Sequence, residues 1–319
     1  MSTAVRGARR RDSGSRRAAS AGRRVGQGSL THPSRTGLLL VSPAVLFVGV
    51  FVLVPLVFAL VISLTNWPLI GTVKFSGLKN YTAIVSDAAF AKSVLYTLLY
   101  TVIVTGPILV LGYALAILVR RKRRGSTLLR TVFFLPFVVG LSTLSFVTVL
   151  EAQPESGVIN IVLKKLGITD GTTAWLVDGP LATGLICVLV IWAVSGLTMM
   201  LLMAGMQSIP RDLYEAASVD GAGNIRQWRN ITLPSLRPVN LVLVLVLFLW
   251  TFSDFNTPYV LFGTAQPPAG DLITFHIYNA SFLTWNFGTG AAMSVLLLIF
   301  LMIVTGAYLL VTGRRSRRA

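Results

Sequence analysis

The sequence has 319 residues, of which 54% are apolar and 12% are charged, and its mean hydropathy is +0.74. A soluble domain normally carries about 25% charged residues, so this composition excludes an ordinary soluble enzyme or binding domain. The formal net charge of +17 would suit a nucleic-acid-binding protein, unless the positions of the basic residues have another explanation.

Long stretches without charged residues indicate the fold class. They cover residues 36–73, 93–119, 131–150, 179–210, 238–253 and 272–313. A membrane-spanning helix requires roughly 20 predominantly apolar residues, and each stretch can contain one, the fifth by continuing past Asp254. We therefore predict an all-α polytopic protein of the cell membrane. Its six transmembrane helices are expected at about 38–64, 93–119, 131–150, 181–206, 241–262 and 290–311.

The positions of the basic residues predict the orientation of these spans. Of the 28 lysines and arginines, nine precede the first span, six lie at 120–130, four at 211–237 and four at 314–318. Cytoplasmic loops of membrane proteins are rich in basic residues, so we expect the N- and C-termini to be cytoplasmic. The charge is then explained by topology, and we expect no nucleic-acid partner.

The spans also define the domain organisation. Residues 1–36 contain mainly Arg, Ser, Gly and Ala and are predicted to form a disordered basic cytoplasmic tail, either simply solvated or attracted to anionic membrane lipid. Residues 37–313 form the six-span transmembrane domain, and residues 314–319 form a basic cytoplasmic C-terminus. The outer segment 151–180 is expected to contain a short helix near 158–166.

No metal site is expected from the cysteine and histidine content. The single cysteine, Cys187, lies inside an apolar span and is predicted to be a packing residue. The two histidines, His32 and His276, are far apart in the sequence and fall on opposite sides of the membrane in the predicted topology.

A polar segment, residues 207–237, interrupts the apolar runs on the predicted cytoplasmic side. We expect a first helix at 209–220, with Ser208 as its N-cap and a glycine, Gly221 or Gly223, in the left-handed conformation that ends it. A second short helix is expected to begin with a capping pair, Asn224 and Gln227.

Pro234 is predicted to end this second helix. The segment would then be a cytoplasmic helix–glycine–helix hairpin with one small-residue face, suited to docking. An alternative is an amphipathic loop that lies on the lipid, which Trp228 and the arginines would also suit.

The spacing within this segment resembles the EAA loop of ABC-importer permeases of the carbohydrate type, the maltose and glycerol-phosphate group. The matching residues are Glu215, Ala216, Ala217, Asp220, Gly221, Ala222, Ile231, Leu233 and Pro234. Elements at 75–81, 130–136 and 287–294 resemble other conserved elements of these permeases. Residues 262–268 depart from the Thr-x-Gly-Gly-Pro turn that similar proteins carry after the fifth span.

The resemblance implies a function and a set of partners. In such importers two permease subunits, usually different chains, form the pathway, and an ATP-binding subunit dimer docks on their EAA hairpins. An extracytoplasmic solute-binding protein delivers the sugar. This sequence has no GxxxxGK[ST] phosphate-binding loop, so we expect a transport subunit that is not itself an enzyme, with ATP and Mg bound by the partner ATPase.

One acidic residue, Asp254, is predicted to lie well inside a span. A charged side chain at that depth is costly and normally faces a cavity or a partner. Candidate substrate-pathway residues are Trp250, Ser253, Asp254, Asn256 and Tyr259, because aromatic faces with amide and carboxylate groups suit sugars. The alternatives are a polar cluster that packs helices, and a substrate site held by the partner permease.

Two other function classes fit the sequence less well. A proton- or sodium-coupled secondary transporter would share the fold class, but it needs coupling-ion sites and typically internal repeats, which the sequence does not show. An intramembrane enzyme needs a catalytic set such as GxSxG or HExxH, which is also missing from the sequence.

The predicted topology can be tested by labelling single cysteines in a Cys187→Ser background. Cysteines placed near Asn80 and Gly171 should react only with reagent added outside the cell, and those near Ser126 and Asn224 only from inside. Labelling near Asn224 from outside would contradict both the topology and the importer interpretation.

Overall fold

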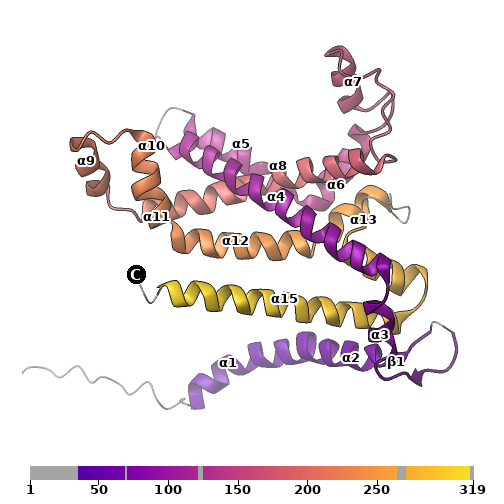
Figure 1. Ribbon diagram of the computed structural model, residues 1–319. Coiled ribbons are helices and arrows are strands. Elements are labelled where there is room, and N and C mark those ends of the chain that lie inside the picture. Colours follow the sequence, from indigo (N-terminus) through magenta and orange to yellow (C-terminus); the bar gives the residue numbers. More distant parts are fainter. Residues whose placement is uncertain (1–34, 69, 121–124, 264–270, 317–319) are drawn as a thin grey trace, which may run out of the picture. The chain divides into compact units, whose positions relative to one another are not determined.

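The computed structural model describes residues 35–68, 70–120, 125–263 and 271–316 (Figure 1). It divides into two compact units, Met1–Pro55 and Leu56–Ala319. Two parts of the sequence named above lie outside the described residues. One is the predicted tail, including His32, apart from its last two residues, and the other is most of the segment 262–268.

The first candidate span, Gly37–Ser63, is a continuous helical run. It consists of α1 (Arg35–Val48), a π-helical turn η1 (Gly49–Leu53) and α2 (Val54–Ser63). Pro55 has no N–H to donate, and the wider turn just before it closes with a bond from the Val54 N–H to the Gly49 carbonyl. Such π-turns insert a residue into an α-helix without ending it.

A short antiparallel strand pair and a helix follow the first span. The strands β1 (Thr65–Asn66) and β2 (Lys74–Phe75) pair antiparallel, and α3 (Lys79–Val85) follows them. The Asn80 amide donates to the carbonyls of Ser63 (2.8 Å) and Thr65 (2.9 Å), and the Tyr81 hydroxyl bonds that of Ser63 (2.6 Å). The element at 75–81 thus satisfies carbonyls that the helix end leaves free.

Four further candidate spans are long apolar helices. They are α4 (Ala88–Arg120), α8 (Gly179–Gln207), the run Arg237–Phe262 and α15 (Phe287–Ser316). The third of these runs consists of α12 (Arg237–Phe252) and α13 (Asn256–Phe262), with a break between them. Together with the first span, these four agree with five of the six predicted spans.

The third predicted span, 131–150, is not one straight helix. It consists of α5 (Ser126–Val139) and α6 (Leu141–Glu151), bent by 91° at Gly140. Gly140 has φ 87° and ψ 144°, a conformation open mainly to glycine. Counting the bent pair as one span gives six, and otherwise the described residues contain five.

Two segments at the same end of the bundle complete the fold. One contains α7 (Val158–Lys165), which confirms the short helix predicted there; its buried Asn160 donates to the carbonyls of Gln153 and Thr173 and accepts from the Trp175 indole. The other, α14 (Ile273–Tyr278) with the π-turn η4 (Asn279–Leu283), precedes α15 and was not predicted.

The core of the larger unit is built around α8. This helix packs along α4 and α5 (Figure 1), and its own glycine permits the close approach to α5. A Cβ on Gly196 would overlap the carbonyl oxygen of Phe133, a backbone atom that cannot rotate away. Small residues at such crossings are typical of membrane helices, which associate through close packing.

Gly196→Ala should therefore destabilise the protein, because overpacking of a well-packed site typically costs about 1–3 kcal/mol. The measurement is the melting temperature in detergent, followed by reaction of the single buried thiol, Cys187, with a fluorogenic maleimide. Gly184→Ala is the matched control in the same helix, since nothing lies within 4 Å of its added Cβ. Equal melting temperatures for the two variants would contradict the close α5–α8 contact.

Candidate functional site

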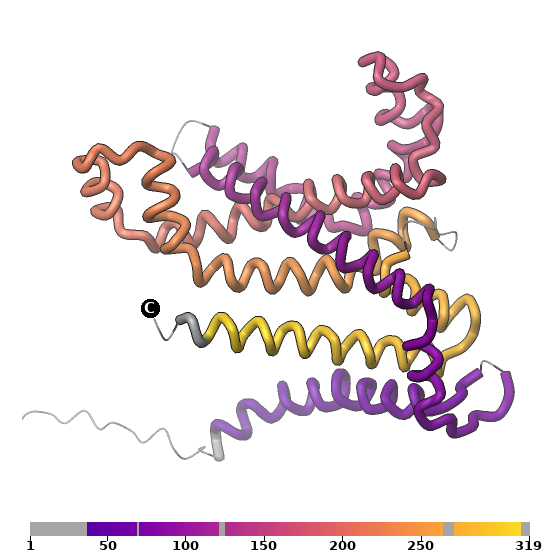
Figure 2. The backbone as a smooth tube through the Cα atoms, viewed as in Figure 1, coloured from indigo at the N-terminus to yellow at the C-terminus, as the bar shows by residue number. Residues whose placement is uncertain are grey.

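The polar segment between α8 and α12 forms a hairpin that projects beyond the ends of these helices (Figures 1 and 2). We call residues 207–237 the hairpin. It contains α9 (Arg211–Val219), α10 (Asn224–Gln227), the π-turn η2 (Trp228–Thr232) and α11 (Leu233–Ser235). The segment around α7 lies at the opposite end of the bundle. This separation agrees with the prediction that the hairpin, with four arginines, and the outer segment 151–180 lie on different sides of the membrane.

The first half of the hairpin begins later than predicted. The helix starts at Arg211 and its N-cap is Pro210, so the assignment of Ser208 as N-cap is wrong. Ser208 instead ends α8, where its hydroxyl donates to the Gly205 carbonyl (2.8 Å). A serine between two helices can hydrogen-bond to the backbone of either one, and here it bonds to the preceding helix.

Gly221 ends α9 as predicted. Its φ is +73°, and two hydrogen bonds close the turn: Gly221 N to the Ser218 carbonyl (3.1 Å) and Ala222 N to the Ala217 carbonyl (2.8 Å). Together these bonds form a Schellman motif, which favours glycine at the left-handed position. The other candidate, Gly223, has φ −68° and is the extended N-cap of α10.

The second half of the hairpin corrects two predictions. Gln227 does not cap its own helix; its amide donates to the Ser218 hydroxyl (2.9 Å) and the Ala222 carbonyl (3.0 Å), and so joins the two halves. Pro234 does not end the helix, which passes through η2 and reaches Ser235. As at Pro55, a π-turn precedes the proline and compensates for its missing N–H.

Further contacts fasten the hairpin to itself and to α4. The hydroxyls of Tyr214 and Thr232 lie 2.9 Å apart across the two halves. The guanidinium of Arg120, at the end of α4, lies 4.6 Å from the centre of the Tyr214 ring, within cation–π distance. The hairpin is therefore an ordered element and not a loose connection.

The base of the hairpin is buried in the membrane domain. Ile209 and Leu236, which flank its helices, are 8% and 0% exposed and belong to one apolar cluster with α4, α8 and α12. A Cβ on Gly205 of α8 would come within 2.8 Å of the Leu236 side chain. Any displacement of the hairpin must therefore move these packed helices or break the cluster.

The predicted docking residues divide into an exposed and a packed group. Glu215, Ala216, Asp220, Gly221 and Pro234 are exposed, whereas Ala217, Ala222, Ile231 and Leu233 are partly buried. Among the described residues, Glu215 and Asp220 have no side-chain hydrogen bond or ion pair. The hairpin thus holds an unpaired carboxylate beside an alanine on its outer face.

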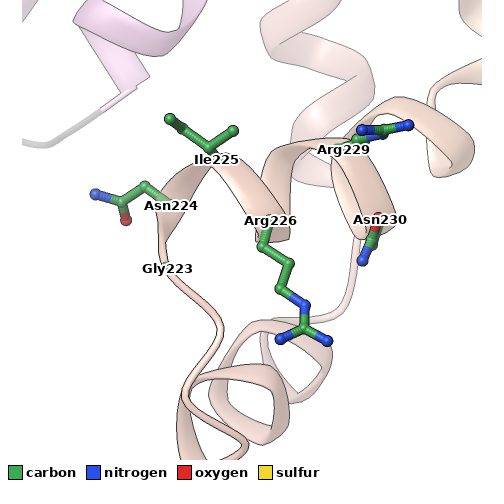
Figure 3. Close-up of a pocket in the computed structure, with 6 residues that line it drawn as sticks. All are labelled: Gly223, Asn224, Ile225, Arg226, Arg229 and Asn230. Atoms are coloured by element: carbon green, nitrogen blue, oxygen red, sulfur yellow. The ribbon is translucent and has the colours of Figure 1, made fainter.

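A shallow groove of about 810 Å³ lies along the second half of the hairpin. Figure 3 shows Ile225 and Arg226 pointing to opposite sides of this half, with Arg229 further along it. Neither arginine has a carboxylate partner among the residues that the structure covers. The exposed surface of the hairpin therefore presents both signs of charge to a docking partner.

The second candidate site surrounds the break between α12 and α13. Asp254 lies in this break, and one carboxylate oxygen accepts from the Thr257 N–H (3.2 Å), as an N-capping side chain does. The other oxygen accepts from the Tyr100 hydroxyl (3.3 Å) of α4. The Thr274 hydroxyl donates to the Asp254 carbonyl (2.7 Å). Both oxygens therefore have partners inside the protein.

The other predicted pathway residues lie around Asp254. Ser253, Asn256, Trp250 and Tyr259 are exposed, the last two by 50% and 37%. Trp250 stacks on Phe137 at 6.1 Å between ring centres, and Tyr259 belongs to an aromatic cluster with Phe255 and Tyr278. Trp250, in α12, and Tyr259, in α13, thus belong to different aromatic groups, one on each side of the break in the chain.

Sequence reasoning missed two partners of Asp254. Tyr100 is buried and precedes it by 154 positions, and Thr274 follows it by 20. Both occur in apolar stretches, where isolated hydroxyls give no local signal. Their only indication in the sequence is the general requirement that a buried carboxylate be hydrogen-bonded.

The described residues contain no cluster of three or more His, Cys, Asp or Glu side chains that could hold a metal ion. His276 has one carboxylate neighbour, Asp271, at 2.8 Å. This hydrogen bond raises the pKa of the His276 imidazole above its usual value. One histidine with one carboxylate is too small a donor set for a structural metal centre.

Comparisons with known proteins identify the family of the chain. The family described as "Binding-protein-dependent transport system inner membrane component" matches residues 108–317. A probable ABC transporter permease protein of Pyrococcus horikoshii is 32% identical over 273 residues, which are 85% of this chain and 94% of that protein. The xylose/arabinose import permease protein XacH of Haloferax volcanii is 33% identical over 251 residues, which are 78% of each chain.

Two other comparisons also match transport proteins. The sulfoquinovosyl glycerol transport system permease protein SmoG of Agrobacterium fabrum is 30% identical over 274 residues, which are 85% of this chain and 88% of that protein. A chain from a crystal structure of a bacterial alginate ABC transporter, in complex with a periplasmic protein bound to alginate pentasaccharide, has a similar fold. Its TM-score is 0.75 at 20% identity, covering 88% of this chain and 93% of that one.

The capping geometry of Asp254 predicts how its variants behave. Asp254→Asn keeps a carbonyl oxygen that can accept from the Thr257 N–H, so the variant should remain folded. Asp254→Leu removes both acceptors and should lower the melting temperature measured through Cys187, because a buried polar group left unpaired costs about 1–3 kcal/mol. If Asp254→Leu and the wild type have the same melting temperature, the Asp254 side chain does not stabilise the break between α12 and α13.

Proposed function

Because the chain belongs to the family of binding-protein-dependent transport system inner membrane components, we propose that it is the permease subunit of an ABC importer for a sugar or a related polar solute. Family membership makes it a multi-pass inner-membrane transport component and not itself an enzyme. It also counts against a proton- or sodium-coupled secondary transporter, the alternative left open by the fold class.

The proposed substrate class follows from the relatives. XacH is named as a xylose/arabinose importer and SmoG as a sulfoquinovosyl glycerol transporter, and the structurally similar chain comes from an alginate transporter. All three solutes carry sugar rings. The exposed aromatic and amide side chains around Asp254 are chemically suited to such rings and hydroxyls.

We place the ATPase contact on the hairpin, and the observation that carries this proposal is the contrast between its two ends. The base, at Ile209 and Leu236, is packed into the core of the spans. The outer face presents the unpaired carboxylate of Glu215 next to Ala216, a side chain small enough to permit close approach. A hairpin whose base is packed into the membrane domain and whose outer face carries an unpaired carboxylate is suited to transmit movement from a docked partner.

The partners follow from the same reasoning. An ATP-binding subunit dimer would receive Glu215, Ala216, Ala217, Asp220, Gly221 and Ala222 and would bind ATP and Mg itself. A second permease subunit would cover apolar faces such as that of α15, of which little is buried within this chain. An extracytoplasmic solute-binding protein would deliver the sugar to the opposite end of the bundle.

The substrate pathway is assigned to the break at Asp254, with Trp250, Ser253, Asn256 and Tyr259. Since both carboxylate oxygens are occupied, the exposed neighbours supply the contacts to sugar and Asp254 keeps them in place. Asp254→Asn separates the two roles, because it retains the cap. Unchanged apparent affinity for uptake in that stable variant would support this holding role, whereas an altered affinity would indicate direct contact between Asp254 and the sugar.

The coupling proposal predicts that Glu215→Ala and Gly221→Val insert normally but lose ATPase binding or sugar uptake. Truncating one member of a buried interfacial charge pair typically costs about 2–5 kcal/mol. A β-branched residue at Gly221 is strained by the left-handed backbone, at about 1–2 kcal/mol, although no atom lies within 4 Å of the added Cβ. The assay is ATPase co-purification together with sugar uptake in the same membranes.

Two control variants accompany this measurement. Gly221→Asn should retain function, since asparagine tolerates the left-handed conformation. Gly223→Ala should also be neutral, because that glycine has a negative φ and open space around it. Normal ATPase binding and uptake in both Glu215→Ala and Gly221→Val would mean that the hairpin is not the coupling element.

A further inference from the structure

A second, larger groove lies between α4 and the hairpin. We call it the α4–hairpin groove. Its volume is about 1160 Å³, above the roughly 300–1,000 Å³ of most small-molecule pockets. Its walls are mainly apolar, with Leu109, Val110, Ala114 and Ile117 from α4 and Ile225 and Leu233 from the hairpin.

One buried polar group in this groove lacks a partner. The indole N–H of Trp228, which lines the groove, is buried and makes no hydrogen bond among the described residues. The ring is fixed edge-on against Tyr113 at 5.9 Å between centres. A buried donor left unpaired is costly, so an acceptor from a bound molecule would relieve a defect that the protein carries.

The end of the groove is positively charged. Arg120 lines it and stacks on Tyr214, and no carboxylate lies within ion-pair distance of its guanidinium in the described part of the chain. An apolar groove with a basic end, located where a membrane helix terminates, matches an anionic lipid, with acyl chains and a phosphate at its head.

We propose that the α4–hairpin groove binds one anionic phospholipid of the cytoplasmic leaflet. Its acyl chain would lie against the α4 wall, and its phosphate would contact Arg120. Because the groove is lined by both α4 and the second half of the hairpin, the lipid would bridge them and stabilise the hairpin in its present position. The membrane's anionic lipid content would thereby adjust the transport rate.

This inference rests on the proposed function for the orientation of the groove and for its effect on transport. The binding site itself depends only on the groove. The lipid should therefore be lost from groove variants whether or not Glu215 and Gly221 prove to be coupling residues, which keeps the two proposals separately testable.

The experiment uses the complete transporter, purified with its partner subunits and placed in nanodiscs of phosphatidylcholine with or without phosphatidylglycerol. Native mass spectrometry should show one phosphatidylglycerol retained per copy of this chain. Ala114→Trp, which fills the groove, should abolish retention, and Arg120→Gln should weaken it about fivefold, the effect of one basic residue near an anionic surface. Arg120→Lys, which keeps the charge, should retain most binding.

Sugar-dependent ATPase activity is the second readout. Phosphatidylglycerol should raise it in the wild-type complex, and this increase should disappear in Ala114→Trp. Val102→Trp is the matched control, because Val102 is an exposed residue of α4 that does not line the groove. Melting temperatures measured through Cys187 verify that each variant is folded.

Three outcomes would overturn the proposal. Equal retention in the wild type and in folded Ala114→Trp would show that the lipid binds elsewhere. Equal retention of phosphatidylcholine and phosphatidylglycerol by the groove would show that the site does not select anionic lipid and that Arg120 does not provide such selectivity. A crosslink from the groove to the second permease subunit would identify a protein as its occupant.

Discussion

The constraint that shapes this structure is the need to satisfy every backbone N–H and C=O group inside a membrane. Hydrocarbon offers no hydrogen bonds, so each interruption of a helix needs a local partner. Asp254 and Thr274 supply partners at the break in the fifth span, and Asn80 supplies them where the first span ends. At these two places polar side chains complete the irregular backbone.

The same constraint explains why the hairpin combines order with an open surface. Its internal bonds, the Schellman turn at Gly221 and the bridge from Gln227, join its two halves without a partner from another part of the chain. Glu215 is consequently free of any structural duty in this chain and available for a partner. An apolar base and a polar, self-contained tip are the two properties that a contact between a membrane domain and an aqueous subunit requires.

Much of this arrangement was predictable from the sequence, and the failures have identifiable causes. Spans follow from hydropathy because a helix is the default in an apolar stretch, and Gly221 was identifiable because few residues tolerate its backbone. The 91° bend at Gly140 was missed, since a glycine inside an apolar run looks like any other span residue. Ser208, Gln227 and Pro234 were misassigned because their hydrogen bonds depend on neighbouring helices. The Tyr100 contact with Asp254 joins residues 154 positions apart, beyond the range of local patterns.

The straight helix α12 links the two sites by a simple geometric relation. It has 16 residues and is therefore about 24 Å long, with Leu236 embedded at one end and the break at Asp254 at the other. A rotation of about 10° around the Leu236 end would carry the far end of such a rod through about 4 Å, comparable to the width of a hydroxyl contact. Under the proposed coupling, the break would act as a joint that lets α13 keep its orientation while α12 rotates. In the proposed importer, a small angular change at the hairpin would thus become a linear displacement large enough to make or break a contact to the solute.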